Sequence, residues 1–188
     1  MYKLKPIFLA FTFLGCADSV ANGMSHPNIK IDTKFLEKCR DTIALFDSNT
    51  DKIKQSESVV INCLAYSEVE TKALAEANRN TKISGSNFIF DYQNCALIMD
   101  NFYYENSVKA SLGGYLIDLS NVDVSLNDGG IYGTILTLEC KGKVDCVGLV
   151  EENRRTDRLS MTLTDKSVYA EQIKEALDKI PFHCANLR

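Results

Sequence analysis

The chain has 188 residues, of which 45% are hydrophobic and 24% are charged, a composition typical of globular rather than disordered or fibrous proteins. Its formal net charge is −4 at pH 7, and an acidic chain offers no basic surface for the phosphates of nucleic acid. The same charge argues against electrostatic attraction to an anionic membrane surface, so any attachment to a membrane would need another cause.

The first 15 residues have the pattern of a secretory signal peptide. Lys3 and Lys5 precede an apolar run from Ile7 to Leu14. This run is too short to cross a bilayer, which takes about 20 residues, but it suits the core of a signal peptide. Residues 16–31 are then expected to form a polar tether between the membrane and the folded part of the chain.

The end of this leader, Phe13-Leu14-Gly15-Cys16, resembles a bacterial lipobox, in which cleavage before the cysteine is coupled to its acylation. The resemblance covers residues 1–16 and implies a lipid on Cys16. Ala17 follows the cysteine in place of an aspartate, which in enteric-type bacteria implies a position on the periplasmic side of the outer membrane. The alternative is ordinary cleavage after Ala21, which would give a soluble periplasmic or secreted protein.

The cysteine count indicates disulfides. Seven cysteines become six once Cys16 is acylated or removed, and an even number behind a signal peptide is typical of an oxidising compartment. The chain has no Cys-x-x-Cys motif, so this pattern favours disulfides over zinc, and we expect neither a metal nor another cofactor. Six cysteines allow many pairings, among which we predict Cys39–Cys63, Cys95–Cys184 and Cys140–Cys146.

Residues 32–80 are expected to form a helical, disulfide-linked N-terminal segment. Thr33 to Asp47 has apolar residues at helical spacing and is followed by a polar connector over residues 48–58. Val59 to Tyr66 is compatible with a strand or with a short helix, because β-branched residues favour strands while its neighbours are helical. Ser67 and Glu70 form a capping box, which predicts a helix to about residue 78 with Val69, Ala73, Leu74 and Ala77 on its apolar side.

Residues 86–188 are expected to form a β-rich domain, because short apolar runs alternate there with polar turns. Gly113-Gly114 is expected to interrupt the strands. Ile131 to Glu151 is predicted to be a hairpin in which Cys140 and Cys146 face each other from the two arms. An amphipathic helix is predicted to begin at Asp165 or Ser167 and to end at Pro181.

About seven strands followed by one amphipathic helix resemble, in layout, a pleckstrin-homology-like barrel. The resemblance is one of architecture and implies no binding of lipid headgroups. We therefore predict an α+β fold, in which a helical N-terminal segment leads into a β-rich barrel or sandwich closed by a C-terminal helix.

No pattern in the sequence identifies catalytic residues, and we predict none. The two histidines are His26 in the tether and His183 beside Cys184, and no nucleophile-elbow, zinc-protease or phosphate-loop motif occurs. A hydrolase that uses carboxylates at strand ends is an alternative, although such residues usually form solvated turns. The candidate carboxylates are Asp91, Asp100, Asp118 and Asp123.

Possible binding residues are one aromatic and two basic side chains. Tyr103 points opposite to Phe102 and Tyr104 if the three lie in a strand, and it is either a contact residue or a cover for the rim of the core. Arg154 and Arg155 lie in a turn that either meets an acidic partner or is simply solvated.

We predict a non-enzymatic extracytoplasmic protein that binds another envelope or secreted protein, with a lipid anchor as its only link to the membrane. An inhibitor of the immunity type, which neutralises a toxin, is one form of this hypothesis. A carrier that holds a small ligand inside the barrel is a further alternative. The sequence does not specify an oligomeric state.

Overall fold

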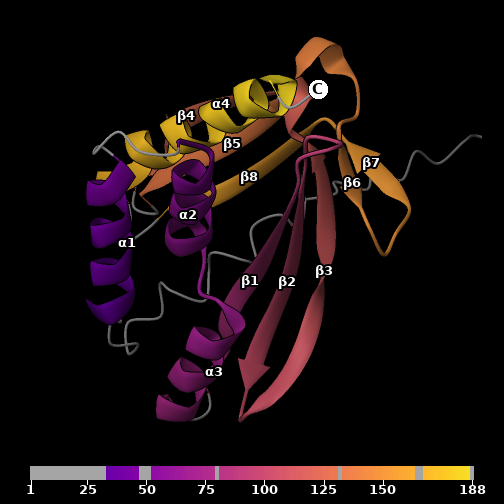
Figure 1. Cartoon of the computed structure of the whole chain (residues 1–188). Coiled ribbons are helices and arrows are strands. Elements are labelled where there is room, and N and C mark those ends of the chain that lie inside the picture. Colours follow the sequence, from indigo (N-terminus) through magenta and orange to yellow (C-terminus); the bar gives the residue numbers. More distant parts are fainter. Residues whose placement is uncertain (1–32, 47–51, 79–80, 131–132, 164–166, 187–188) are drawn as a thin grey trace, which may run out of the picture.

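A computed structural model describes residues 33–46, 52–78, 81–130, 133–163 and 167–186 (Figure 1). The predicted signal peptide, the tether and Cys16 lie outside these residues. None of the described helices is long and apolar enough to span a membrane. In chain order, the helices and strands are α1 (Thr33–Phe46), α2 (Lys52–Leu64), α3 (Glu68–Ala77), β1 (Ile83–Asp91), β2 (Ala96–Glu105), β3 (Val108–Asp118), β4 (Val122–Asp128), β5 (Thr134–Cys140), β6 (Val147–Leu149), β7 (Arg154–Thr156), β8 (Arg158–Leu163) and α4 (Ala170–Asn186), with short 3-10 turns η2 (Leu119–Asn121), η4 (Lys141–Lys143) and η5 (Ser167–Tyr169).

The strands form two antiparallel sheets, which confirms the α+β class. Sheet A has the strand order β1-β2-β3-β6-β7, and sheet B has the order β4-β5-β8. The described strands do not close into a barrel, because no ladder joins the two sheets. The chain instead passes from sheet B to sheet A in the short link between β5 and β6.

That link overturns the predicted hairpin from Ile131 to Glu151. β5 pairs with β4 and β8, while β6 pairs with β3 and β7, so the two expected arms belong to different sheets. Within the link, η4 contains Gly142 at φ 67°, a left-handed conformation that glycine adopts without strain. This turn redirects the chain out of sheet B, whereas a hairpin would have returned it along β5.

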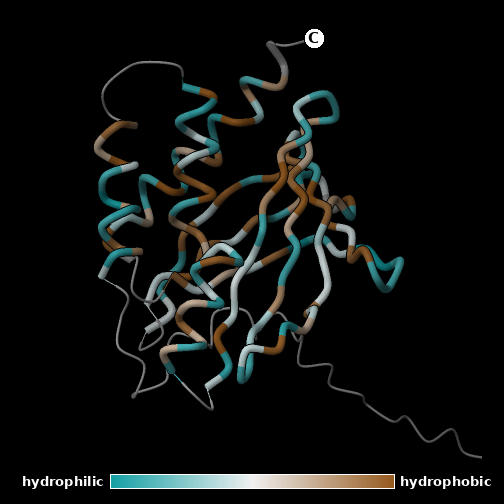
Figure 2. Tube along the Cα trace, turned by 60° about the horizontal axis from the view of Figure 1, so that its bottom comes forward, coloured by the Kyte–Doolittle hydropathy of each residue, from teal (hydrophilic) through white to brown (hydrophobic). Residues whose placement is uncertain are grey.

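The main hydrophobic core lies between the two sheets and the helices, and a smaller cluster of Ala75, Ile83, Phe102 and Tyr104 lies where α3 meets sheet A. α4 packs against α2 and β4, and α1 packs against α2, so the N-terminal and C-terminal helices share this core (Figure 1). Figure 2 shows hydrophobic stretches gathered where the strands of both sheets meet the helices. The largest fully buried side chains of this core are Leu97, Ile117, Leu119, Leu136, Leu138, Leu163, Ile173, Leu177 and Ile180, with Val59 and Val60 of α2.

In α2, burial against the core outweighs the local preference of its residues for other structure. α2 begins at Lys52, inside the predicted polar connector, and the ambiguous segment after Val59 is helical. Val59, Val60 and Cys63 are buried at helical spacing against the core. Burial of that face outweighs the weak strand preference of the β-branched residues, which is worth less than about 1 kcal/mol per residue.

α3 begins as predicted but buries another face. Ser67 and Glu70 form the capping box, with the Glu70 carboxylate accepting from the Ser67 backbone N–H at 2.9 Å. Val69, however, is exposed, whereas Thr71 and Ala75 are buried. The helix lies so close to β1 that small side chains must face the strand, and this closeness is not visible in the helix's own sequence.

The two glycines at positions 113 and 114 do not interrupt the sheet. β2 is one continuous strand, and the chain turns after it at Asn106 and Ser107, both at positive φ. β3 then runs through Gly113 and Gly114, opposite a register shift at Asn101 and Phe102 of β2. A glycine at the shift accommodates the bulge, so these residues bend the strand instead of ending it.

α4 also continues beyond its predicted end. The helix passes through Pro181 to Asn186, so Cys184 lies in its last turns. Proline removes one backbone donor from the helix. The bond from Cys184 to Cys95, together with the buried face of α4, holds the helical turns beyond it.

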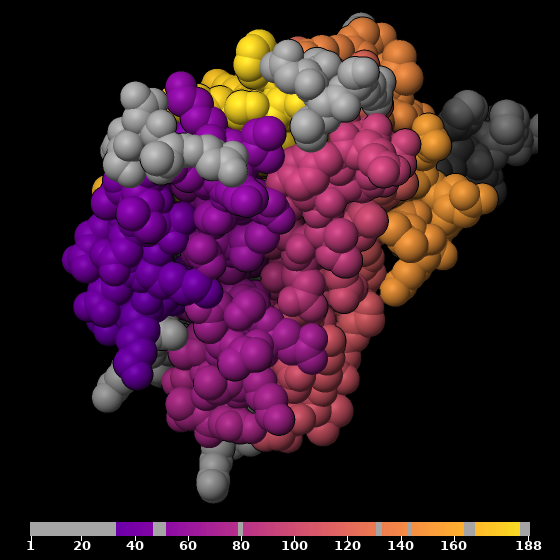
Figure 3. Space-filling model, viewed as in Figure 1, coloured from indigo at the N-terminus to yellow at the C-terminus, as the bar shows by residue number. Residues whose placement is uncertain are grey.

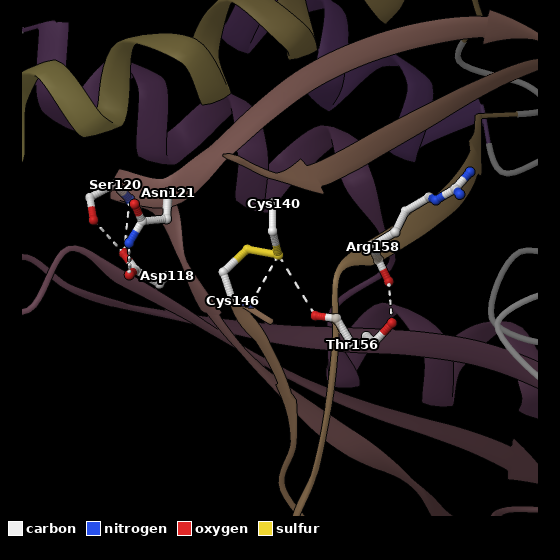
Figure 4. Close-up of a disulfide and its surroundings, with 7 residues drawn as sticks. All are labelled: Asp118, Ser120, Asn121, Cys140, Cys146, Thr156 and Arg158. Atoms are coloured by element: carbon white, nitrogen blue, oxygen red, sulfur yellow. Dashed lines mark hydrogen bonds between the residues drawn. A yellow bond between two sulfur atoms is a disulfide. The ribbon is translucent and has the colours of Figure 1, made fainter. Parts of the chain in front are cut away.

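The described residues contain three disulfides, in the pairing predicted from the sequence. Cys39–Cys63 joins α1 to α2, and Cys95–Cys184 joins the start of β2 to the end of α4. Cys140–Cys146 joins the end of β5 to the residue before β6, and it therefore links the two sheets rather than the arms of a hairpin (Figure 4).

Candidate functional site: the open face of sheet A

The residues predicted for binding do not form one site. Tyr103 is half-buried, and the Nζ of Lys82 lies 4.8 Å from the centroid of its ring. By strand register Tyr103 shares a face with buried Met99, while Arg155 is on the opposite face of sheet A. Arg154 and Arg155 lie in the edge strand β7 rather than in a turn, and Arg154 is paired with Glu152 at 3.1 Å.

Two of the four candidate carboxylates of a hydrolase, Asp91 and Asp118, hold turns, while Asp100 and Asp123 lie within β2 and β4. Asp91 accepts from the backbone N–H groups of Gln93 and Asn94 at 3.1 and 3.2 Å, and Asp118 accepts from Ser120 and Asn121 (Figure 4). The hydrogen bonds from Asn94 lower the pKa of Asp91, whereas a general acid needs a raised pKa. Asp123 lies 3.7 Å from the Nζ of Lys141 on the surface.

A row of apolar side chains crosses the outer face of sheet A. Ile89 pairs with Ile98, Ile98 pairs with Leu116, and Leu116 pairs with Gly148. Residues paired directly across neighbouring strands share one face of the sheet. Ile89 is 61% exposed and Leu116 is 45% exposed, so this row faces outward from the core.

Val150 extends this apolar row on the same face. It follows Gly148 by two residues, and its N–H donates to the carbonyl oxygen of Gly114 at 3.0 Å, so the ladder continues past the end of β6. A Cβ placed on Gly114 would lie 3.6 Å from Cγ2 of Val150, and one on Gly148 would lie 3.9 Å from Cβ of Leu116. Val150 is 61% exposed. We define Ile89, Ile98, Leu116 and Val150 as the apolar row.

Charged and polar residues surround the apolar row. Arg155 pairs with Gly148 and is exposed at the β7 end, and Asp100 pairs with Gly114 and is exposed nearer β1. Glu151, exposed next to Val150, accepts from Ser111 Oγ at 3.3 Å. An apolar centre with a charged rim is the usual anatomy of a protein–protein contact surface.

α3 bounds the apolar row by covering the other end of the same face. Glu68, in its first turn, accepts from Lys109 Nζ at 2.8 Å and from Tyr104 Oη at 3.1 Å. Asn87 Nδ2 also donates to Glu68, at 3.5 Å. One carboxylate thus ties α3 to β1, β2 and β3, and the sheet beyond it towards β6 has no helix on its outer face among the described residues.

The hydrogen bonds that Glu68 accepts from Lys109, Tyr104 and Asn87, called here the Glu68 clamp, predict a pH-dependent stability. The hydrogen bond from Lys109, followed by that from Tyr104, lowers the pKa of Glu68 below its ordinary value of 4.5. A carboxyl with a lowered folded pKa stabilises the fold above its ordinary pKa, and this stabilisation is lost as the pH falls through the folded pKa. We expect Glu68→Gln to lower the unfolding midpoint at neutral pH, and we expect this difference to shrink below pH 4.5.

Denaturant unfolding of both proteins across this pH range measures the effect. Glu76→Gln is the matched control, since Glu76 is exposed on the same helix, and its difference from the wild type should change little with pH. An equal loss for Glu68→Gln at all pH values would show that the carboxylate charge contributes nothing to the clamp.

A depression of about 300 Å³ lies between α1 and α2. It is open and lined mainly by polar residues, and within this lining Asn62 Nδ2 donates to Thr42 Oγ1 at 3.3 Å. Sites for small ligands are usually more enclosed and more apolar. It therefore offers less for recognition than the outer face of sheet A.

The apolar row was missed in the sequence because alternation draws attention to the other face. Phe88 and Phe90 mark the core face of β1, and Ile89 between them is easily taken for an ordinary exposed residue. The available signal was repetition. The tripeptides 88–90, 97–99 and 115–117 are each apolar at all three positions, and strands of an antiparallel sheet with one wet face rarely have this pattern in succession.

Comparisons of the chain with protein-family models, curated proteins and solved structures found no match. The described residues contain no group of three or more His, Cys, Asp or Glu side chains arranged to hold a metal ion.

Proposed function

We propose that this chain is a non-enzymatic binding protein of the cell envelope and that its partner docks on the apolar row of sheet A. The signal-peptide pattern and the disulfides support an oxidising extracytoplasmic location. The lipobox-like Cys16 supports a lipid anchor on the periplasmic side of the outer membrane, with a soluble periplasmic or secreted protein as the alternative. The main support for a docking surface is the outward-facing apolar row.

Burial of the apolar row by a partner would remove exposed apolar surface from water. Scattered apolar residues on a surface are ordinary, but a contiguous set on one flat face marks an interaction site. Ile89 lies in β1, Leu116 lies in β3 and Val150 directly follows β6, and the three meet on one face of the sheet, so presenting them requires no ordering of a long loop. A rigid, pre-formed surface lowers the entropy cost of association.

The rim defines the partner that fits. Arg155 is exposed at one end of the row, so the partner should present a carboxylate there and apolar side chains over Leu116 and Ile89. Asp100, on the other side, would face a basic or polar group. These features describe another folded envelope or secreted protein, and a toxin neutralised by this chain is the sharper form of the proposal.

The test is a crosslinking pull-down of the tagged protein from its own cells, read by mass spectrometry. We expect one stoichiometric partner, whose binding is then measured with purified proteins. Leu116→Glu and Ile89→Glu should each weaken binding by about 30-fold or more, since central apolar contacts dominate such interfaces. Leu116→Ala, which leaves the strand uncharged, should weaken binding in the same direction.

Val168→Glu is the matched control, because Val168 is an equally apolar, exposed residue in η5 before α4, away from sheet A. Its binding should stay at the wild-type level. Full binding by Leu116→Glu and Ile89→Glu would exclude the apolar row as the contact surface, and a toxin-like partner would identify the inhibitor form.

A further inference from the structure

The three disulfides differ in how well solvent can reach them. Cys39 and Cys63 are fully buried, and Cys95 and Cys184 are buried at 2% and 3% exposure. Cys140 is buried at 6%, but Cys146 is half-buried at the surface. A thiolate attacks one sulfur of a disulfide along the bond, so access to a single sulfur is sufficient. Of the six paired cysteines, Cys146 is the most exposed in the folded protein.

The surroundings of the bond favour attack at Cys146. The backbone N–H of Cys146 donates to Cys140 Sγ at 2.9 Å, and the carbonyl oxygen of Thr156 lies 3.7 Å from the same sulfur (Figure 4). Attack at Cys146 makes Cys140 the leaving group, and a hydrogen-bonded thiolate is a better one. Once protonated, the Cys140 thiol can donate to Thr156.

The Cys140–Cys146 disulfide also lies at the junction between the two sheets. It links the end of β5 in sheet B to the start of β6 in sheet A, across a link that contains Gly142 at positive φ and exposed Lys141, Val144 and Asp145. β6 is short and pairs with β3 over three residues, from Tyr115↔Leu149 to Ile117↔Val147. The β6–β7 hairpin projects at one side of the molecule (Figure 3).

We propose that Cys140–Cys146 is a thiol-exchange site, which a dithiol reductant opens in the folded protein and which thereby controls the β6–β7 hairpin. One thiolate of the reductant bonds to Cys146 Sγ, and the electron pair of the disulfide passes to Cys140 Sγ. The second thiolate of the reductant then attacks the mixed disulfide and releases the Cys146 thiolate. The reductant leaves as its own disulfide, and its two protons balance those taken up by the two cysteines.

Reduction should loosen the hairpin without unfolding the protein. The backbone bonds from Cys140 N to Asp157 O at 2.7 Å and from Asp118 N to Cys146 O at 3.0 Å still span the junction. The hairpin carries Val150 and Arg155, so its release should weaken partner binding. This last consequence rests on the proposed function, whereas the exchange itself does not.

The experiment treats the folded, oxidised protein with a small dithiol without denaturant, labels the free thiols by alkylation and maps them by mass spectrometry. Cys140 and Cys146 should be labelled together, about tenfold faster or more than the other four, whose exposure requires opening of the core. Labelling of all six at one rate, labelling of another pair first, or no labelling before unfolding would each overturn the proposal.

A second measurement follows the hairpin by hydrogen exchange. In the mildly reduced protein and in Cys140→Ser/Cys146→Ser, protection should fall at β6 and β7 and remain in α2 and α4. A matched variant, Cys39→Ser/Cys63→Ser, should leave β6 and β7 protected. Unchanged protection at β6 and β7 after selective reduction would overturn control of the hairpin. If the hairpin loosens and partner binding is unchanged, the docking surface is wrong and the thiol-exchange site stands.

Discussion

Replacing Cys95 and Cys184 together by alanine is expected to lower the free energy of unfolding by about 4.5 kcal/mol, the largest effect of any single cross-link in this chain. The two residues are separated by 89 positions, and in the chain-entropy model a longer closed loop removes more freedom from the unfolded state. Loss of this bond also frees the last turns of α4, which continue beyond Pro181. A loss of this size approaches the whole stability of many domains.

The other two disulfides are the internal standards for this prediction. Cys39–Cys63 closes a separation of 24 and should contribute about 3.5 kcal/mol, and Cys140–Cys146 closes a separation of 6 and should contribute about 2 kcal/mol. Denaturant unfolding of the three double-alanine variants measures the order. If the Cys140/Cys146 variant were the least stable, loop closure would not be the main origin of the stabilisation.

Gly85→Ala is expected to cost about 3 kcal/mol, because no space exists for a methyl group between β1 and α3. A Cβ on Gly85 would lie 2.1 Å from Oγ1 of Thr71 and 2.6 Å from the backbone oxygen of Tyr66. Neither atom can move freely. Thr71 Oγ1 donates to the Ser67 carbonyl at 2.7 Å, and the Tyr66 oxygen accepts from the backbone N–H of Ser86 at 2.9 Å.

Gly148→Ala is the matched control for this change, since it also adds one methyl group to a strand of sheet A. Its nearest neighbours would be the oxygen and Cβ of Leu116 at 3.7 and 3.9 Å, which is ordinary contact. Its unfolding free energy should stay within about 0.5 kcal/mol of the wild type. Equal losses for the two variants, measured by denaturant unfolding, would mean that strand flexibility and not the approach of α3 sets the cost at Gly85.

Short-range patterns in the sequence predicted those structural features that depend only on residues close together in the chain. The capping box of Ser67 and Glu70 predicted where α3 begins, and helical spacing predicted α1 and most of α4. The alternating positions Leu136, Leu138 and Cys140 lie on the core face of β5, where they are buried. The cysteine pairing was also predicted, although the geometry expected for Cys140–Cys146 was wrong.

Contacts between distant residues decided the rest. The sequence of α3 suggests an apolar side that includes Val69. In the folded chain, however, α3 packs against β1 close to Gly85, and Thr71 and Ala75 are the buried residues. The candidate site has the same origin. Ile89, Leu116 and Val150 are each unremarkable in sequence, and only the strand order of sheet A places them on one face.

By itself, the sequence determined the α+β class, the start of α3 and the even number of cysteines available for disulfides, because periodicity, caps and cysteine parity are local or countable properties. Only the tertiary structure decided that β5 and β6 belong to different sheets and that the apolar row exists. Strand pairing depends on which distant segments meet, and its free energy comes from packing shared among them rather than from any one segment's residues.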